Sequence, residues 1–144
     1  MSDSVLHVPR EQLIETVSRL RDGGYVMVLD VTAVDYLQHP GRDDLPPEVT
    51  AERFEVVVTL ISHAELARIR LRVQVPAEDP TVPTLFDLFP GTEALEREVA
   101  DMFGIVFEGH PDPTRILMPP DWDGHPLRKD FSVGRIPVQF KATR

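Results

Sequence analysis

Cysteine is absent from the 144 residues of this chain. Its absence excludes disulfides, thiol catalysis, all-cysteine zinc sites and an all-cysteine iron–sulfur cluster within the chain. The chain also lacks the apolar run of about 18 residues that crosses a bilayer, since its most apolar stretches are Tyr25–Leu29 and Phe54–Ile61. The acidic N-terminus has no apolar signal-peptide core. We therefore expect no export signal and no direct membrane insertion.

Basic residues are scarce over most of the chain. Residues 1–114 carry 9 Lys and Arg against 21 Asp and Glu, whereas residues 115–144 carry 6 against 3, so −12 and +3 give the net charge of −9. Phosphate binding needs a dense basic face, which argues against nucleic acid as a partner. The basic end suits an acidic protein surface, although simply solvated charge gives the same pattern. No P-loop or Gly-x-Ser-x-Gly motif supports nucleotide binding or hydrolysis.

Hydrophobic periodicity predicts one α+β domain, with a small mixed or antiparallel sheet, helices on one face and an extended Pro-rich C-terminal arm. Residues 38–51 and 76–83 are rich in proline and charge and are expected as loops. In chain order the predicted elements are a helix over about Arg10–Asp22, strands over Tyr25–Leu37, Phe54–Ile61 and Arg68–Val75, a helix over about Thr92–Phe103 and a short strand over Ile105–Phe107.

The segment after residue 107 is the least typical of a folded domain. Five prolines between Pro111 and Pro126 exclude a helix. Ordering such a segment costs on the order of 1.5 kcal/mol per residue, and its few apolar side chains offset little of that. We therefore predict a globular body, residues 1–107, and a C-terminal docking arm, residues 108–144, that belongs to the same domain and does not fold independently. A tail that wraps around its own domain is the alternative.

The arm contains the tripeptide Gly-His-Pro twice, each time after an acidic residue. The two histidines, His110 and His125, together with Asp112 and Asp130, have the chemistry of metal ligands or of an acid/base set. Their spacing of 15 residues matches no compact metal motif. Turn geometry is the simpler interpretation, and a stand-alone metal enzyme that uses His110 and His125 is kept as an alternative.

Charged residues flank the apolar stripe of the second predicted helix. Glu96, Glu98 and Asp101 form a carboxylate cluster, but such charges usually lie on a solvated or salt-bridged face. Arg97 is placed to pair with Asp101 at i+4. Trp122 in the arm is expected to be an interface anchor.

The same region carries an ordered series of short motifs. They are Glu96-Arg97-Glu98, Asp101-Met102-Phe103-Gly104-Ile105, Gly109-His110-Pro111-Asp112, Arg115-Ile116-Leu117 and the run from Asp121-Trp122 through Gly124-His125-Pro126 to Arg128-Lys129-Asp130. Together they closely resemble the signature of the thirty-kilodalton, or C-type, subunit family of respiratory complex I, the proton-translocating NADH:quinone oxidoreductase. The resemblance extends upstream over nearly the whole chain.

This resemblance implies a structural subunit of the peripheral arm, in the quinone module, without catalytic residues or cofactors of its own. NADH, FMN, iron–sulfur clusters and quinone would be bound by other subunits. The C-terminal arm would dock on the neighbouring forty-nine-kilodalton-type subunit, which holds the protein peripherally on the cytoplasmic side of the cell membrane. The implied docking positions are Glu96, Arg97, Glu98, Asp101, Phe103, Gly104, Gly109, His110, Pro111, Arg115, Trp122, Gly124, His125, Pro126, Arg128, Lys129 and Asp130.

The chain departs from the family where Ala94 and Ala100 replace frequent aromatic residues and Pro113 replaces an aliphatic one. We see no long terminal extension, so we expect a stand-alone subunit and not a fusion with the forty-nine-kilodalton-type partner. A related membrane-bound hydrogenase or a ferredoxin- or F420-linked oxidoreductase would use the same scaffold. The sequence does not separate these complexes, because the electron donor is bound elsewhere.

Overall fold

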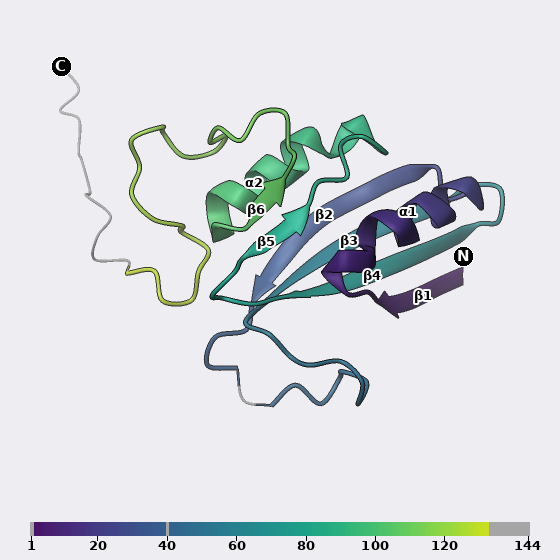
Figure 1. Cartoon of the computed structure of the whole chain (residues 1–144), viewed down its shortest axis with the longest axis horizontal. Helices are drawn as coiled ribbons and strands as arrows, with labels where there is room; N and C mark the ends of the chain where they lie inside the picture. Colours follow the sequence, from purple (N-terminus) through teal and green to yellow (C-terminus); the bar gives the residue numbers. More distant parts are fainter. Residues whose placement is uncertain (1, 40, 133–144) are drawn as a thin grey trace, which may run out of the picture.

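The computed structural model describes residues 2–39 and 41–132, and a four-stranded sheet is its centre. The strands lie in the order β1-β4-β3-β2, and Figure 1 shows helices α1 and α2 beside them. Strands β5 and β6 form a separate parallel pair. The elements are β1 (Ser2–His7), a 3-10 turn (Arg10–Gln12), α1 (Leu13–Asp22), β2 (Met27–Asp35), β3 (Phe54–Ser62), β4 (Ala67–Val75), β5 (Thr81–Pro83), a 3-10 turn (Pro90–Thr92), α2 (Glu93–Phe103) and β6 (Val106–Glu108).

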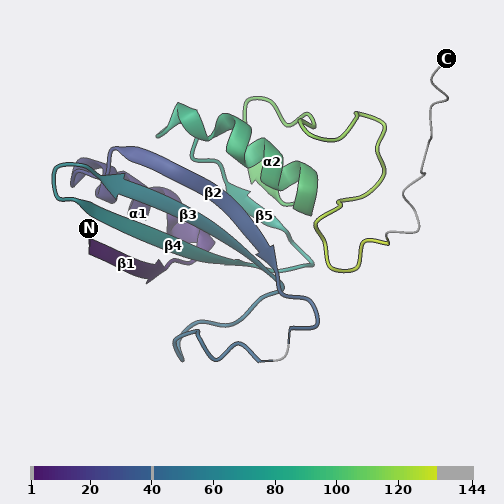
Figure 2. The same ribbon diagram turned by 180° about the vertical axis from the view of Figure 1, so that it is seen from behind.

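The core lies between one face of the sheet and the two helices. Strands β2, β3 and β4 are antiparallel, and their inward residues, such as Val31, Val58 and Leu71, occupy the same row of the sheet. These residues pack in one buried cluster with Val17 of α1 and Val99 of α2. Figure 2, seen from behind, shows the sheet with α1 on its far side. The predicted α+β architecture, a mixed sheet with helices on one face, is confirmed.

Two strands differ from the sequence prediction. Strand β1 was not expected, because its residues are exposed or half-buried and show no apolar alternation. It forms by parallel pairing with the edge of β4. Strand β5 lies inside the segment 76–83 that was predicted as a loop, and only pairing with β6 makes it a strand. Strand pairing across a sheet is a tertiary event that neither segment reveals by itself.

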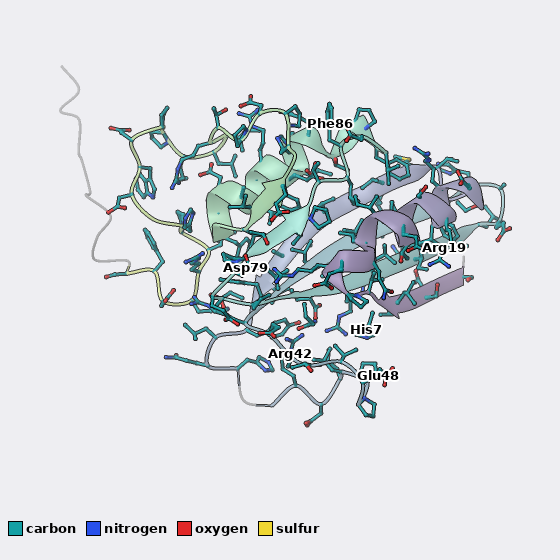
Figure 3. The ribbon with its side chains drawn as sticks, in the orientation of Figure 1. His7, Arg19, Arg42, Glu48, Asp79 and Phe86 are labelled. Atoms are coloured by element: carbon teal, nitrogen blue, oxygen red, sulfur yellow. The ribbon has the colours of Figure 1, made fainter. Side chains whose placement is uncertain are left out.

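The loop between β2 and β3 covers part of the outer face of the sheet. Arg42 is only 8% exposed and donates to Glu55 at 2.6 Å, and Arg72 donates to the same carboxylate at 2.7 Å. Figure 3 shows Arg42 in this loop, with Glu48 further along it and His7 at the end of β1. The described residues between 38 and 51 form a loop, as predicted, and the buried Glu55 carboxylate holds the part around Arg42 against the strands.

Helix α2, the longer of the two helices in the described part of the chain, has 11 residues. Among the described residues, no helix combines the length and apolarity needed to cross a membrane.

Candidate functional site

The arm is attached to the body through the buried carboxylate of Asp101 in α2. Its Oδ2 accepts the main-chain N–H groups of Ile116, Leu117 and Met118 at 3.1, 2.7 and 2.8 Å. Its Oδ1 accepts Nη1 of Arg115 at 2.8 Å, and the Asp101 side chain is 0% exposed. Burial opposes ionisation, but these N–H groups and the Arg115 charge outweigh it, so the pKa of Asp101 is lowered. A single ionised side chain therefore fixes four consecutive residues of the arm.

The C-terminal end of α2 binds the second Gly-His-Pro segment. Main-chain oxygens at a helix end lack partners within the helix, so they accept donors from elsewhere. The donors here are Nδ1 of His125 to the oxygen of Asp101 at 3.0 Å, N of Leu127 to the oxygen of Met102 at 3.0 Å, and Nε of Arg128 to the oxygen of Phe103 at 2.6 Å. The arm thus completes the hydrogen bonding of the helix end.

Gly104 ends α2 in the left-handed region, with φ of 73°. A Cβ atom at this position would lie 2.6 Å from Nη2 of Arg128 and 2.6 Å from Cδ2 of His125. Glycine is therefore required both by the backbone and by the close approach of the arm.

An ion-pair network fixes the arm further along the chain. Asp35 at the end of β2 accepts Nη2 of Arg53 at 2.9 Å and the main-chain N–H of Lys129 at 2.8 Å. The same Arg53 donates to Asp130 at 2.8 Å. Burial of Asp35 raises its pKa, but the Arg53, Lys129 and Leu37 donors lower it more, so the net shift is downward. Residues 129 and 130 are thus bound to the sheet and not to the helix.

A second buried carboxylate, Glu96, binds the segment after β5. It accepts the main-chain N–H of Leu85 at 2.7 Å and interacts with the hydroxyl of Thr84. Burial dominates here and raises the pKa of Glu96 despite these donors. The interpretation of Glu96 as part of a solvated face was wrong. Glu96 lies three and seven residues before Val99 and Phe103, so its helical position within the apolar stripe was the available signal.

A cavity of about 250 Å³ lies between α2, β6 and the arm. Apolar side chains such as Ile105 and Phe107 line one part of it, and Arg97, His110 and His125 line another. Ala100 and Pro113, two positions at which the chain departs from the resembled family, also line the cavity.

The expected docking positions occupy three different environments. Three are buried: Glu96, Asp101 and Phe103. Nine are half-buried: Arg97, Gly104, His110, Arg115, Trp122, Gly124, His125, Pro126 and Arg128. Five are exposed: Glu98, Gly109, Pro111, Lys129 and Asp130.

The expected pairing of Arg97 with Asp101 is not formed. Arg97 instead pairs with Glu93 at 3.3 Å and donates to the main-chain oxygens of Thr114 and Arg115. Asp101 is turned toward the arm, which supplies better-placed donors than its own helix does. The sequence analysis did not identify Asp35, which binds the arm, or Thr84, which binds Glu96 of α2. No local pattern indicates these contacts, because the partners are distant in the sequence.

Both histidines of the repeated motif form hydrogen bonds with main-chain groups. Nε2 of His110 lies 2.9 Å from the oxygen of Glu93, and its Nδ1 accepts the N–H of Asp112 at 3.0 Å. A neutral ring with its proton on Nε2 satisfies both contacts and leaves no lone pair for a metal. In the described part of the chain, no cluster of three or more His, Cys, Asp or Glu side chains is arranged to hold a metal ion.

Residues 6–136 match the family described as the respiratory-chain NADH dehydrogenase 30 kDa subunit. The chain is 44% identical over 142 residues to NADH-quinone oxidoreductase subunit 5 of Thermus thermophilus, covering 95% of this chain and 65% of that protein. It is 46% identical over 141 residues to the C-type subunit of NADH-quinone oxidoreductase from Herpetosiphon aurantiacus, covering 96% and 76%. The chain therefore spans less than two thirds of the Thermus relative's length.

Two solved structures are similar to this fold. A trypsin-resistant fragment (1–134) of Nqo5 superposes with a TM-score of 0.66 at 41% identity, covering 75% of this chain and 80% of that one. A chain of the membrane-bound sulfane sulfur reductase, an archaeal respiratory membrane complex, superposes with a TM-score of 0.73 at 25% identity, covering 100% and 85%.

Proposed function

The chain belongs to the respiratory-chain NADH dehydrogenase 30 kDa subunit family, and on that premise we propose that it is a cofactor-free scaffold subunit of a proton-translocating NADH:quinone oxidoreductase. In this proposal it braces the quinone module of the peripheral arm, docks on the forty-nine-kilodalton-type subunit and lies on the cytoplasmic side of the cell membrane. Electron transfer runs through the partner subunits, and this chain supplies no catalytic residue.

One observation carries the proposal. Ile116, Leu117 and Leu127 are 40%, 56% and 52% exposed, although the backbone of each is hydrogen-bonded to Asp101 or Met102. Because the backbone at these positions is already fixed, a partner that covers the side chains has little backbone entropy left to remove. We call this the apolar docking surface, defined by Ile116, Leu117 and Leu127. It is suited to a permanent protein contact.

This proposal does not specify the identity of the electron donor. The likeness to the sulfane sulfur reductase chain extends over the whole length of this chain. The same scaffold therefore also fits a related membrane-bound complex with a different donor module, such as a hydrogenase or a ferredoxin- or F420-linked oxidoreductase. The co-purifying subunits distinguish these possibilities, because the donor site lies outside this chain.

The test is co-purification from solubilised native membranes with the chain tagged. We expect the wild-type chain to be recovered with a forty-nine-kilodalton-type subunit and with the flavoprotein that oxidises NADH. The double variant Leu117→Ser, Leu127→Ser should lose that recovery while it stays folded. The matched control is Leu66→Ser, because Leu66 is 64% exposed on the β3–β4 hairpin, far along the sequence from the docking surface. Recovery of the wild-type chain without any partner would disprove the scaffold role.

A further inference from the structure

The guanidinium of Arg128 is held in place without an acidic partner. Its Nε–H donates to the main-chain oxygen of Phe103, and its Cζ lies 5.2 Å from the centre of the Phe54 ring. Within residues 2–39 and 41–132, its two terminal amino groups donate no hydrogen bond, and no carboxylate forms an ion pair with it. Four N–H groups of a fixed cation therefore lack a protein acceptor in this part of the chain.

The two acidic side chains that act on this cation, Asp130 and Asp35, are already bound by other donors. All 24 Asp and Glu residues precede residue 131 in the sequence, and residues 133–144 contain neither type. The carboxylates of the surrounding network are bound by other donors: Asp130 by Arg53, Asp35 by Arg53 and a main-chain N–H, and Asp101 by Arg115 and three main-chain N–H groups.

The environment makes an unpaired guanidinium unfavourable. Burial of Arg128 and the like charge of Arg53 lower the pKa of its guanidinium, and the nearby carboxylates only partly oppose them. A partly desolvated cation beside another cation is stabilised when an anion joins it. Arg19, Arg21 and Arg70 form no ion pair among the described residues either. Arg19 and Arg70 are exposed and therefore hydrated, and half-buried Arg21 donates to the main-chain oxygen of Leu88. Arg128 differs from them because the like charge of Arg53 acts on it.

The surroundings of Arg128 define the chemistry of a partner. Leu127, next to it in the chain, belongs to the apolar docking surface, and Lys129 on its other side is an exposed cation without an ion pair in the described part of the chain. Although the chain as a whole is acidic, Arg128 and Lys129 form no ion pair among the described residues, and both lie near the exposed apolar side chain of Leu127 in the sequence. The complementary surface is apolar and carries at least one carboxylate.

We propose that Arg128 is the ionic anchor of the docking arm and that it binds the carboxylate of an Asp or Glu flanked by apolar residues on the partner subunit. This inference rests on the proposed function, because it assumes that the arm docks on another protein. The two terminal amino groups of a guanidinium match the two oxygens of a carboxylate. The contact to Phe103 already fixes their direction, so docking needs little further ordering.

Cross-linking in the assembled complex tests the contact directly. Arg128→Lys places an amine at this position, and a carbodiimide condenses that amine with an adjacent carboxylate into an amide, with loss of water. We expect mass spectrometry to find residue 128 joined to an Asp or Glu of a co-purified subunit. Arg70→Lys is the control, because Arg70 is exposed on β4 and should give no such product.

Affinity provides the second measurement. Retention of this chain on the tagged remainder of the complex is measured against rising salt. Arg128→Gln should weaken binding by on the order of 30-fold or more, whereas Arg70→Gln should not. Amide substitution of the cross-linked partner carboxylate should give a similar loss, and the double variant should lose little more. The melting temperature of each isolated variant separates loss of the contact to Phe103 from loss of the partner.

The possible failures are distinguishable. A wild-type chain that co-purifies with nothing overturns the proposed function itself. If wild-type assembly is normal but Arg128→Gln binds equally well and position 128 gives no cross-link, only the ionic anchor is wrong. Binding of the isolated chain to vesicles of anionic phospholipid, lost in Arg128→Gln while assembly is unchanged, would assign the cation to a lipid headgroup and also overturn the inference.

Discussion

The carboxylate of Asp101 in α2 accepts the main-chain N–H of Leu117 at 2.7 Å, although the Leu117 side chain points away from the body and is 56% exposed. A buried charge thus fixes the backbone of the residue that presents the largest exposed fraction of the apolar docking surface. Polar contacts fix the backbone of residues 115–118 and 127–129 of the arm, while the apolar side chains of Ile116, Leu117 and Leu127 stay exposed. Folding of the body and preparation of the docking surface are therefore coupled through one helix.

Asp101→Asn should strongly destabilise the chain. An amide cannot accept the N–H groups of Ile116, Leu117 and Met118 and also face Arg115, because one of its two polar ends is a donor. Breaking a buried charge contact costs about 3 kcal/mol or more, measured as the free energy of unfolding in urea. Asp123→Asn is the control, because Asp123 is exposed in the same segment. Equal stabilities would show that Asp101 does not hold the arm.

Gly104→Ala should move the arm away from the helix end. The positive φ of residue 104 alone costs an alanine at least about 1 kcal/mol, and its Cβ would overlap His125 and Arg128. Gly91→Ala is a suitable control, because a Cβ there has no atom within 4 Å. Thermal unfolding measures the loss of stability, and limited proteolysis should detect faster cleavage after Arg115. Identical behaviour of the two variants would contradict the close contact.

Glu96→Gln should change how stability depends on pH. The raised pKa means that the folded state favours the protonated form, so the stability from this group is present below about pH 4.5, the ordinary value, and declines as the pH rises through the folded pKa. The glutamine variant keeps an acceptor for Leu85 and has no charge to bury, so its advantage over wild type should grow from pH 5 to 8.

The measurement is the melting temperature of both proteins across this pH range. Glu98→Gln is the control, because Glu98 lies on the same helix and is exposed. The carboxylates with lowered pKa, Asp35 and Asp101, lose their contribution as the pH falls through their folded pKa, and they do so in wild type and variant alike. A difference between wild type and Glu96→Gln that does not vary with pH would contradict the raised pKa of Glu96.

Truncation after His110 should destabilise the body as well as prevent assembly. Removal of the arm leaves the buried carboxylate of Asp101 without the main-chain donors and Arg115, and exposes the main-chain oxygens of Met102 and Phe103. We expect a lower melting temperature for residues 1–110 than for residues 1–132. A fragment of residues 1–110 with the stability of the longer one would show that the body is independent of the arm.

Local sequence patterns predicted most elements of this fold because their signals are short-range. Hydrophobic periodicity predicted α1, α2 and strands β2, β3 and β4, each within a few residues of the correct boundary. Strands β1 and β5 were not predicted, because they exist only through pairing with distant segments. The fold class follows from the predicted elements, because β2, β3 and β4 form the whole antiparallel part of the sheet.

The sequence by itself determined the helices, the antiparallel strands, the lack of thiol chemistry and the family signature, since each depends on residue identity or near spacing. Only the tertiary structure decided what the charged residues do. Asp101 has a polar neighbour on its own helix, yet it binds the arm because the fold brings several donors to one buried carboxylate. Arg128 is unpaired among the described residues because the fold assigns the acidic side chains around it to other donors. Burial and pairing of charge depend on distant segments, so no local pattern encodes them.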